Sequence, residues 1–368
     1  MSLRLAYVMG ARNNADTVAE MKRGAYPRAE FQVFLERNQA TLLDYGTLEA
    51  SSLPLARFFL RRGQWNWGVA ACALAATPRF DSFLTTGEDI GLPLALLAGA
   101  RGVRSPIHII THGSYFGSGK FRSLMKLVRR MKNVRFLCLA DSLRVRLIED
   151  FGVPPARALN AGYAADTCFF APSSAAPQND LIASAGSANR DYRTLVQTAS
   201  ALNAQVKIAA GSAWFNNISV DISGESLPAN IESRSRNYLE LRELYASALF
   251  VVVPLHPGKH ACGYAVIADA MAMGKAVIAT RTDSVSDFLV DGETGFYVRP
   301  GDADDLQKRM RFFLDNPEEA LRMGSLGRER MVRDFSVESY CLRLEQALGV
   351  TGASTEAVPN AATDSFVR

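Results

Sequence analysis

The sequence predicts an α/β fold made of two doubly wound parallel-sheet domains that face each other across a cleft. The chain has 368 residues, more than one ordinary hydrophobic core holds and suited to two domains of roughly 150–200 residues each. Short apolar runs alternate with helical segments along both halves, which is typical of parallel sheets. Residues 249–280 have the order strand, glycine-bearing loop, helix and strand, which indicates a parallel βαβ unit.

In the first half, apolar runs bounded by polar residues or glycine predict strands, and the segments between them have helical patterns. The expected strands are residues 3–9, 31–35, 80–85, 107–111 and 135–140. The expected helices are residues 57–77, 92–98, 119–131 and 142–151. This half is therefore expected to form one parallel sheet with helices packed against it.

The second half repeats the alternation after residues 154–176, an Ala- and Pro-rich segment that predicts a connection between domains. The expected strands are residues 181–186, 206–210, 249–254 and 276–280, and the expected helices are 192–202, 238–247 and 264–273. We divide the chain into Rossmann-like domains of residues 1–170 and 171–334. A helix at about residues 335–348 is expected to pack back near the first domain, and the polar, aperiodic residues 349–368 predict a disordered tail.

Composition and charge exclude several classes of protein. Hydrophobic residues make up 48% of the chain and charged residues 21%, as in a packed globular protein. The net charge of +4 is too small to indicate nucleic-acid binding. The five cysteines show no zinc-binding spacing, so reduced thiols in the cytoplasm are expected. The sequence contains no apolar run of about 18 residues, so no membrane-spanning helix is expected. Residues 1–10 are too short and strand-like for a signal peptide.

The loop before the helix at 264–273 is the strongest candidate for a ligand site. It contains Lys259, His260 and Gly263. Free N–H groups and the dipole at a helix N-terminus favour an anion such as a diphosphate, and open α/β sheets bind ligands at the carboxyl ends of their strands. The sequence therefore predicts a nucleotide site here. A dinucleotide oxidoreductase is disfavoured, because no Gly-x-Gly-x-x-Gly follows a strand with an acidic partner about 20 residues later.

Residues 263–302 resemble the donor-binding half of the retaining GT-B glycosyltransferases of family four, the glycosyl transferases group 1. The shared motifs are, in order, the loop residue Gly263, the carboxylate Asp269, then residues 270–275 (AMAMGK), 279–280 (AT), 291–295 (DGETG) and 300–302 (PGD). Residues 152–154 (GVP), Asp166, Phe170 and Pro172 are similar to the crossover between the two domains of that family. The resemblance implies the GT-B plan and covers residues 80–348 better than residues 1–79.

By this resemblance we expect transfer of a sugar from a UDP- or GDP-linked nucleotide sugar to a glycan or lipid-linked acceptor, with retention at the anomeric carbon. Such transfer serves cell-envelope polysaccharide or glycolipid synthesis. We expect no metal ion, no cofactor beyond the donor and no nucleic-acid partner. We expect a cytoplasmic enzyme, peripheral at the inner membrane face where the acceptor is lipid-linked. Two alternatives remain open: a sugar-nucleotide epimerase on the same fold and a non-catalytic protein that binds nucleotide sugars.

Cations and backbone N–H donors are expected to converge on the departing diphosphate, whose negative charge grows in the transition state. The expected donor-binding residues are Gly10, Arg190, Lys259, His260, Gly263, Tyr264, Ala265 and Asp269. Arg190 matches a basic residue with which the family binds the diphosphate, and residues 263–265 offer backbone N–H groups. Asp269 has the place of the second glutamate of the family and is expected to accept hydrogen bonds from the ribose hydroxyls.

His112 is the expected catalytic residue. It follows the strand at 107–111, where the resemblance places a histidine beside the donor sugar and the acceptor. His108 lies inside that strand and is expected to pack in the interior. The first glutamate of the family corresponds to Ala261 in this chain, so the residue that contacts the donor sugar there is left open.

Residues 119–132 predict an amphipathic, basic helix. Phe121, Leu124, Met125, Val128 and Met131 share one face at helical spacing, and Lys and Arg residues occupy most of the rest, without an acid. One interpretation is a helix that covers the first sheet and exposes its basic face to solvent. The other adds a peripheral contact with anionic membrane lipid, worth on the order of 1 kcal/mol for each basic residue near the surface.

Overall fold

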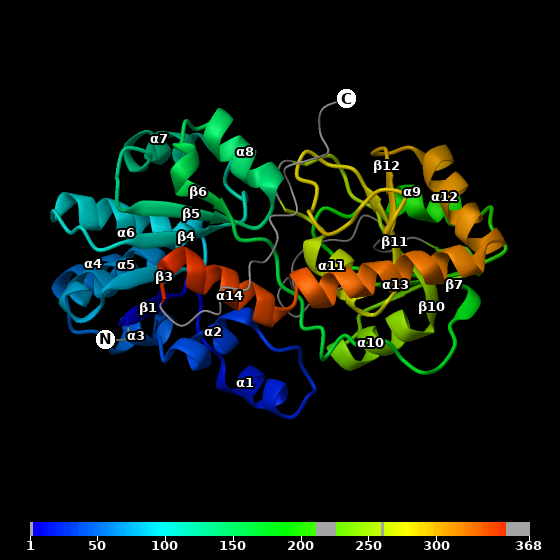
Figure 1. Cartoon of the computed structure of the whole chain (residues 1–368), viewed down its shortest axis with the longest axis horizontal. Helices are drawn as coiled ribbons and strands as arrows, with labels where there is room; N and C mark the ends of the chain where they lie inside the picture. The colour runs from blue at the N-terminus through cyan, green and yellow to red at the C-terminus, as the bar shows by residue number, and fades with distance from the viewer. Residues whose placement is uncertain (1–2, 211–225, 259–260, 351–368) are drawn as a thin grey trace.

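The computed structural model describes residues 3–210, 226–258 and 261–350, so Lys259, His260 and nearly all of the predicted tail lie outside the described residues. Each half of the chain forms a six-stranded sheet (Figure 1). The strand orders are β2-β1-β3-β4-β5-β6 and β12-β11-β10-β7-β8-β9, and every neighbouring pair is parallel. The predicted α/β class with two doubly wound parallel sheets is confirmed.

The first sheet comprises β1 (Leu5–Val8), β2 (Thr41–Leu43), β3 (Ser82–Thr85), β4 (Ile107–Thr111), β5 (Val134–Cys138) and β6 (Ala158–Asn160). The helices of this half are α1 (Ala15–Lys22), α2 (Glu30–Asn38), α3 (Tyr45–Ala50), α4 (Pro54–Arg61), α5 (Trp65–Ala75), α6 (Glu88–Ala100), α7 (Gly119–Val128) and α8 (Asp141–Glu149). Strands β1, β3 and β4 are buried at every residue, because helices flank both faces of a parallel sheet.

The second sheet comprises β7 (Gln178–Ala185), β8 (Gln205–Ala209), β9 (Ile231–Arg234), β10 (Ala248–Val253), β11 (Ala276–Thr280) and β12 (Gly295–Val298). Its helices are α9 (Tyr192–Ala199), α10 (Tyr238–Ser247), α11 (Tyr264–Ala272), α12 (Ala303–Asp315) and α13 (Pro317–Asp334). The last helix, α14 (Val337–Leu348), lies beside α2 of the first half (Figure 1). There Arg37 Nε donates to Glu345 Oε1 at 2.8 Å.

Buried apolar side chains form two clusters that share the strand β10. Val251 and Val253 point into the larger cluster, which extends from the first sheet to one face of the second. Phe250 and Val252 point into the smaller cluster on the opposite face, where Phe250 packs on Phe313 of α12. The alternation follows from the two-residue period of a strand. Because the larger cluster is continuous between the halves, the two sheets are held by common packing.

Two predicted elements are wrong in type or extent. Residues 31–35 belong to helix α2, not to a strand, because Phe31, Phe34 and Leu35 have the spacing of one helical face. Phe31 and Phe34 pack on Tyr7 of β1, with ring centroids 6.2 and 5.8 Å away. The helix predicted at 57–77 is two helices, α4 and α5, and Gly63 separates them with a φ of 68°.

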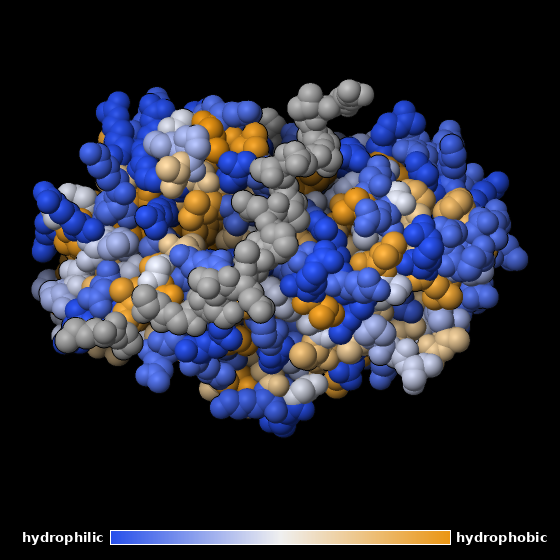
Figure 2. Space-filling view, viewed as in Figure 1, coloured by the Kyte–Doolittle hydropathy of each residue, from blue (hydrophilic) through white to orange (hydrophobic). Residues whose placement is uncertain are grey.

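The surface in Figure 2 is hydrophilic over most of the face shown, with apolar residues scattered between polar ones. The apolar face of the basic helix α7 packs against the interior, as expected for a helix that covers the first sheet. Phe121, Met125 and Val128 are buried. Arg129 at its end is half-buried and donates from Nη1 to Phe151 O at 3.2 Å. Lys126 and Arg130 are exposed. Across the described ranges, no helix combines the length and hydrophobicity needed to span a membrane.

Candidate active site

A cavity of about 880 Å³ lies between the two halves of the molecule. Tyr7 of β1, Glu30 of α2 and His112, just after β4, line it from the first half. Arg190, after β7, and Asp269 of α11 line it from the second half. The cavity therefore lies at the carboxyl ends of both sheets, the position at which open α/β sheets bind ligands, and it has the volume of a small-molecule site. We call it the interdomain cleft.

Helix α11 begins at the cleft, and its N-cap residue is Gly263, with φ 81°. Among the described residues, no side chain accepts a hydrogen bond from its first turn. The φ of Gly263 favours glycine, and a Cβ at this position would also make a close contact of 3.2 Å with Val253 Cγ1. Tyr264 and Ala265 line the cleft, and the first turn contains no acid. The free N–H groups and the helix dipole make this end of α11 attractive to an anion.

Arg190 places a guanidinium at the same end of the cleft. Its side chain is only 7% exposed. Nε donates to Ala185 O at 2.8 Å and Nη1 to Ala188 O at 2.7 Å, which fixes the orientation of the group. Within the described residues Nη2 has no hydrogen-bond partner, and it lies over Gly186, where a Cβ would collide with it. A preoriented positive charge with a free donor is suited to a phosphate oxygen.

His112 faces the cleft from the first half. Its Nε2 lies 2.9 Å from Thr86 O, an arrangement in which a proton on Nε2 donates to the carbonyl. The next residue, Gly113, donates from its N–H to Glu88 Oε1 at 2.7 Å. Glu88 is 2% exposed, and burial raises its pKa although His112 opposes the shift. Glu88 thus holds the turn that carries His112, a positioning role that the sequence did not suggest.

Asp269 lies in the second turn of α11, half-buried at the cleft wall. Burial, with a further contribution from Asp166, raises the pKa of this carboxyl well above its usual value. Burial raises the pKa of Tyr163 and Tyr245 as well, and the Asp269 carboxyl adds to both shifts. The Tyr245 hydroxyl is buried without a hydrogen-bond partner in the described part of the chain. The Asp269 carboxyl therefore lies near the phenol groups of Tyr163 and Tyr245, in a poorly solvated position.

Most of the predicted site residues meet in the interdomain cleft. They are His112, Arg190, Gly263, Tyr264, Ala265 and Asp269. Gly10 is not among the residues that line it, and its Cα instead faces the side chains of Asn66 and Asp89. Lys259 and His260 lie outside the described residues. Glu30 and Tyr163 line the cleft but belong to segments in which no motif marked them.

Two further features of the site concern histidine and metal ligands. His108 is buried inside β4, as expected, and burial lowers its pKa to about 4, with Arg135 adding to the shift. Over the described ranges, no group of three or more His, Cys, Asp or Glu side chains is placed to hold a metal ion.

Comparison with known proteins finds sequence similarity in the second half of the chain. Residues 193–330 match the family model described as Glycosyl transferases group 1. A trehalose synthase of Pyrococcus horikoshii is 33% identical over 86 residues, covering 23% of this chain and 20% of the relative. The MMP alpha-(1->4)-mannosyltransferase of Mycolicibacterium hassiacum is 36% identical over 103 residues, covering 27% of this chain and 24% of the relative. The match thus spans about a fifth to a quarter of the length of these curated relatives.

Comparison of structures covers nearly the whole chain. HepE of Anabaena, solved in complex with UDP, superposes with a TM-score of 0.68 over 94% of this chain and 100% of its own. The sequence identity is 10%, so this likeness concerns the fold. The two parallel sheets with flanking helices match the GT-B glycosyltransferase fold.

Proposed function

We propose that this chain is a glycosyltransferase that binds a UDP- or GDP-linked sugar in the interdomain cleft and transfers the sugar, with retention, to a glycan or lipid-linked acceptor. The observation that carries the proposal is the convergence of Arg190 and the uncapped N-terminus of α11 on one cavity. The match of residues 193–330 to a glycosyltransferase family and the UDP bound by the structural neighbour HepE support it.

In the proposed reaction the bond from the anomeric carbon to the diphosphate breaks, and an acceptor hydroxyl oxygen bonds to that carbon as its proton passes to the departing diphosphate. Negative charge grows on the diphosphate as it departs. Arg190 Nη2 and the N–H groups of residues 263–265 stabilise this charge because they are fixed before the reaction begins. These hydrogen-bond donors stabilise the charge that a metal ion stabilises in other transferases, so the proposal needs no metal ion and no cofactor beyond the nucleotide sugar.

The two remaining predicted residues have separate parts in this proposal. Asp269, at the cleft wall, accepts hydrogen bonds from the ribose hydroxyls. His112 lies beside the anomeric carbon, and its ring is held by Thr86 O. Nucleotide sugars are cytoplasmic substrates in this proposal, and a lipid-linked acceptor brings the enzyme to the inner membrane face.

Isothermal titration calorimetry with UDP, GDP and NAD tests the proposal. Arg190→Gln should weaken binding of the preferred diphosphate about 10- to 100-fold, because a charge-assisted hydrogen bond is lost. Arg328→Gln is the matched control: its guanidinium also bonds main-chain carbonyls, those of Thr167, Phe170 and Ala272, but it does not line the cleft.

Three results would overturn the proposal: binding of NAD in preference to UDP and GDP, no binding of either diphosphate, or equal losses in the two variants. Incubation with UDP- and GDP-sugars then separates the enzyme classes. A new glycoside and free nucleotide diphosphate indicate transfer, whereas an epimerised sugar product indicates the alternative enzyme on the same fold.

A further inference from the structure

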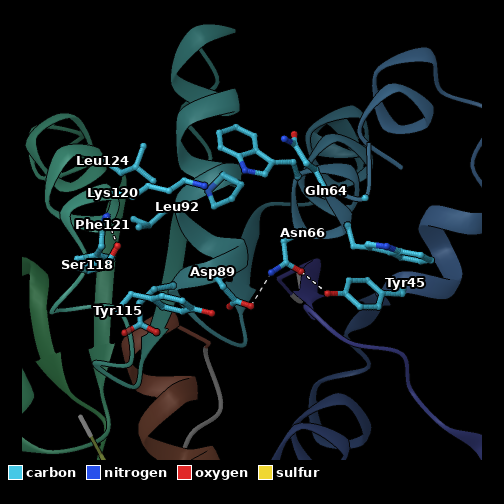
Figure 3. Close-up of a pocket in the computed structure, with 15 residues that line it drawn as sticks. Tyr45, Gln64, Asn66, Asp89, Leu92, Tyr115, Ser118, Lys120, Phe121 and Leu124 are labelled. Carbon is cyan, nitrogen blue, oxygen red and sulfur yellow. Dashed lines mark hydrogen bonds between the residues drawn. The ribbon is translucent and has the colours of Figure 1, made fainter. Parts of the chain in front are cut away.

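A second cavity, of about 400 Å³, opens in the first half of the molecule beside the interdomain cleft (Figure 3). We call it the aromatic pocket, because five aromatic side chains line it: Tyr45, Trp65, Trp67, Tyr115 and Phe121. They come from α3, α5, the turn after β4 and α7, so four separated segments build one pocket. A pocket lined by aromatic side chains around a few fixed polar groups is the usual form of a small-molecule site.

The polar end of the aromatic pocket is a fixed carboxylate. Tyr45 Oη donates to Asn66 Oδ1 at 2.7 Å, and Asn66 Nδ2 donates to Asp89 Oδ2 at 2.7 Å (Figure 3). Among the described residues, Asp89 Oδ1 accepts no hydrogen bond from a side chain or N–H group. One carboxylate oxygen is therefore used for orientation, while the other has no donor among the described residues and belongs to a side chain that lines the pocket, so it can accept from a ligand hydroxyl.

Tyr115 lies on the other side of this carboxylate, with its hydroxyl pointing toward Asp89 in Figure 3. The side chain is 45% exposed although it is a large aromatic group. Burial raises the pKa of Tyr45 and of Tyr115, and in both cases the Asp89 carboxylate adds to the shift. Both phenols therefore stay protonated at neutral pH. Tyr115 presents an apolar ring face and a hydroxyl to the same space.

The aromatic pocket shares a wall with the interdomain cleft. The wall is formed by Thr86 and Gly87, in the turn after β3, and by Glu88, the first residue of α6: Thr86 lines the cleft and Glu88 lines the pocket. A Cβ at Gly87 would lie 2.7 Å from Asp89 Oδ1 and 3.8 Å from His112 Cδ2, so both side chains approach this residue. Glu88 lines the pocket while its Oε1 accepts from the Gly113 N–H beside His112. A group bound at Asp89 is thus next to the catalytic histidine that we propose.

We propose that the aromatic pocket binds the acceptor as an uncharged sugar unit, with a ring hydroxyl bonded to Asp89 and the ring packed on the aromatic side chains. This inference rests on the proposed glycosyltransferase function and adds the chemical class of the acceptor. A sugar ring has apolar C–H groups on its faces and hydroxyls around its edge, which matches aromatic walls around the Asp89 carboxylate. A phosphate or uronate at the same position meets the negative charge of Asp89, and Lys120 is the one cation among the described residues that line the pocket.

Asp89 also has an ordinary structural explanation, which the experiment must separate from this one. It lies in the first turn of α6, where a negative charge stabilises the helix dipole, and its bond to Asn66 ties α6 to α5. In that case neither Asp89 nor Tyr115 affects the binding of sugars.

Tryptophan fluorescence detects binding in this pocket directly, because Trp65 and Trp67 line it and the chain has only 3 tryptophans. The full chain, saturated with whichever of UDP and GDP it binds, is titrated with the methyl glycosides of glucose, galactose and mannose, and with methyl glucuronide as the anionic counterpart of the glucoside. At least one neutral glycoside should give a saturable change. The glucuronide should bind about tenfold more weakly than its neutral match, as expected for a charge repelled by Asp89.

Two exposed aromatic residues provide a matched pair of variants. Tyr115→Ala should weaken binding of the neutral glycoside about tenfold, because the ring face and hydroxyl are lost. Phe58→Ala removes a ring that is equally exposed, 45%, but lies on α4 outside the pocket, and it should leave the affinity unchanged. Asp89→Asn should weaken neutral binding about tenfold and abolish the discrimination against glucuronide. Thermal unfolding midpoints verify that each variant is folded.

The outcomes separate this inference from the proposed function. If UDP or GDP binds but none of the three neutral glycosides does, or if Tyr115→Ala and Asp89→Asn bind them like the wild type, the acceptor assignment is wrong and the donor site stands. Preference for glucuronide also overturns it. If neither UDP nor GDP binds, the proposed function fails first, and the assignment of an acceptor fails with it.

Discussion

The substitution Asp269→Asn should raise the stability of the protein and lower its affinity for nucleotide. Asparagine has almost the shape of aspartate, but it cannot ionise, so it mimics the neutral acid. Burial, aided by Asp166, already raises the pKa of Asp269 well above its usual value. The fold thus favours the neutral form of this side chain, whereas the proposed ribose contact uses the ionised form. Stability and binding should therefore respond in opposite directions.

The effect on stability depends on pH, and its sign follows from the raised pKa. Because the pKa of Asp269 is higher in the folded than in the unfolded state, its contribution to stability is complete below the unfolded pKa. That contribution is lost as pH rises through the folded pKa. The amide side chain of the variant does not titrate, so the variant loses no stability from this position over the same range.

Asp269 is half-buried. Among the described residues, no hydrogen bond from a side chain or N–H group offsets the effect of burial on its carboxyl. At pH 8 the free energy of unfolding of Asp269→Asn should thus exceed that of the wild type by about 1–3 kcal/mol, the usual cost of a poorly solvated polar group. The difference should vanish near pH 4, about the unfolded pKa of Asp.

The effect on binding should have the opposite sign. A carboxylate accepts from both ribose hydroxyls, whereas the amide offers one acceptor, so UDP should bind about 1–3 kcal/mol more weakly to Asp269→Asn. In the wild type, the ligand lowers the pKa of Asp269, so binding should release protons and strengthen as pH rises from 5 to about 8. Calorimetry in two buffers of different ionisation enthalpy measures the released protons, and denaturant unfolding measures stability.

Asp287→Asn is the matched control for this experiment. Burial raises the pKa of Asp287 too, but its carboxylate accepts from Asn160 Nδ2 and Asp141 N, and it does not line the cleft. Its substitution should leave UDP affinity and proton release unchanged. If Asp269→Asn binds UDP with wild-type affinity and wild-type pH dependence, the ribose assignment is wrong. If the variant is less stable than the wild type at pH 8, the argument from burial is wrong.

Two further predictions concern the other residues singled out by the sequence. His112→Ala should lower turnover far more than UDP affinity, as expected of a group that acts beside the anomeric carbon; wild-type turnover would return His112 to a structural role. For the membrane contact, we expect the protein to co-sediment with anionic liposomes, more weakly at high salt. The double substitution of Lys126 and Arg130 by Glu should abolish this, whereas Arg129 is left intact because it bonds Phe151 O. Equal recovery with neutral and anionic liposomes would leave α7 as a packing helix only.

The sequence predicted the interior of the fold better than its edges, for physical reasons that single elements show. Strands β10 and β11 are buried at every residue, so their apolar runs are long and uninterrupted and hard to mistake. The error at residues 31–35 has the opposite cause. That run contains five residues, and over so short a length the period of a strand and that of a helix differ little. The packing of Phe31 and Phe34 on Tyr7 of β1 favours the helix. Because Tyr7 lies in another part of the sequence, the pattern of residues 31–35 alone does not reveal this contact.

The candidate site likewise contains residues that the sequence predicts and residues that it does not. Gly263 and Asp269 lie on one continuous βαβ unit, so their spacing along the chain reports their spacing in space. The aromatic pocket has no such signature: its polar and aromatic residues come from separate elements, and each alone looks like a surface or helix-start residue. Gly10 shows the boundary between the two cases. Its position at a strand end predicts an approach to a ligand site, but Gly10 lines neither cavity and instead faces the side chains of Asn66 and Asp89, which come from distant parts of the sequence.

An alanine, Ala261, stands where the resemblance implies an acidic side chain. Ala261 is half-buried at the cleft, and its N–H donates to His112 O at 3.4 Å. The backbone before α11 is thereby joined to the residue after β4, so the N-terminus of α11 and the His112 loop stay close without a polar side chain at position 261. This hydrogen bond fixes the N–H groups at the start of α11, the proposed diphosphate donors, relative to His112. Both depend on backbone positions and not on the side chain at position 261. By the resemblance, the side chain missing at position 261 is a carboxylate that would contact the hydroxyls of the donor sugar. We infer that donor-sugar selectivity depends on other cleft residues, and Ala261→Glu should change the preference among UDP-sugars while leaving the affinity for UDP itself nearly constant.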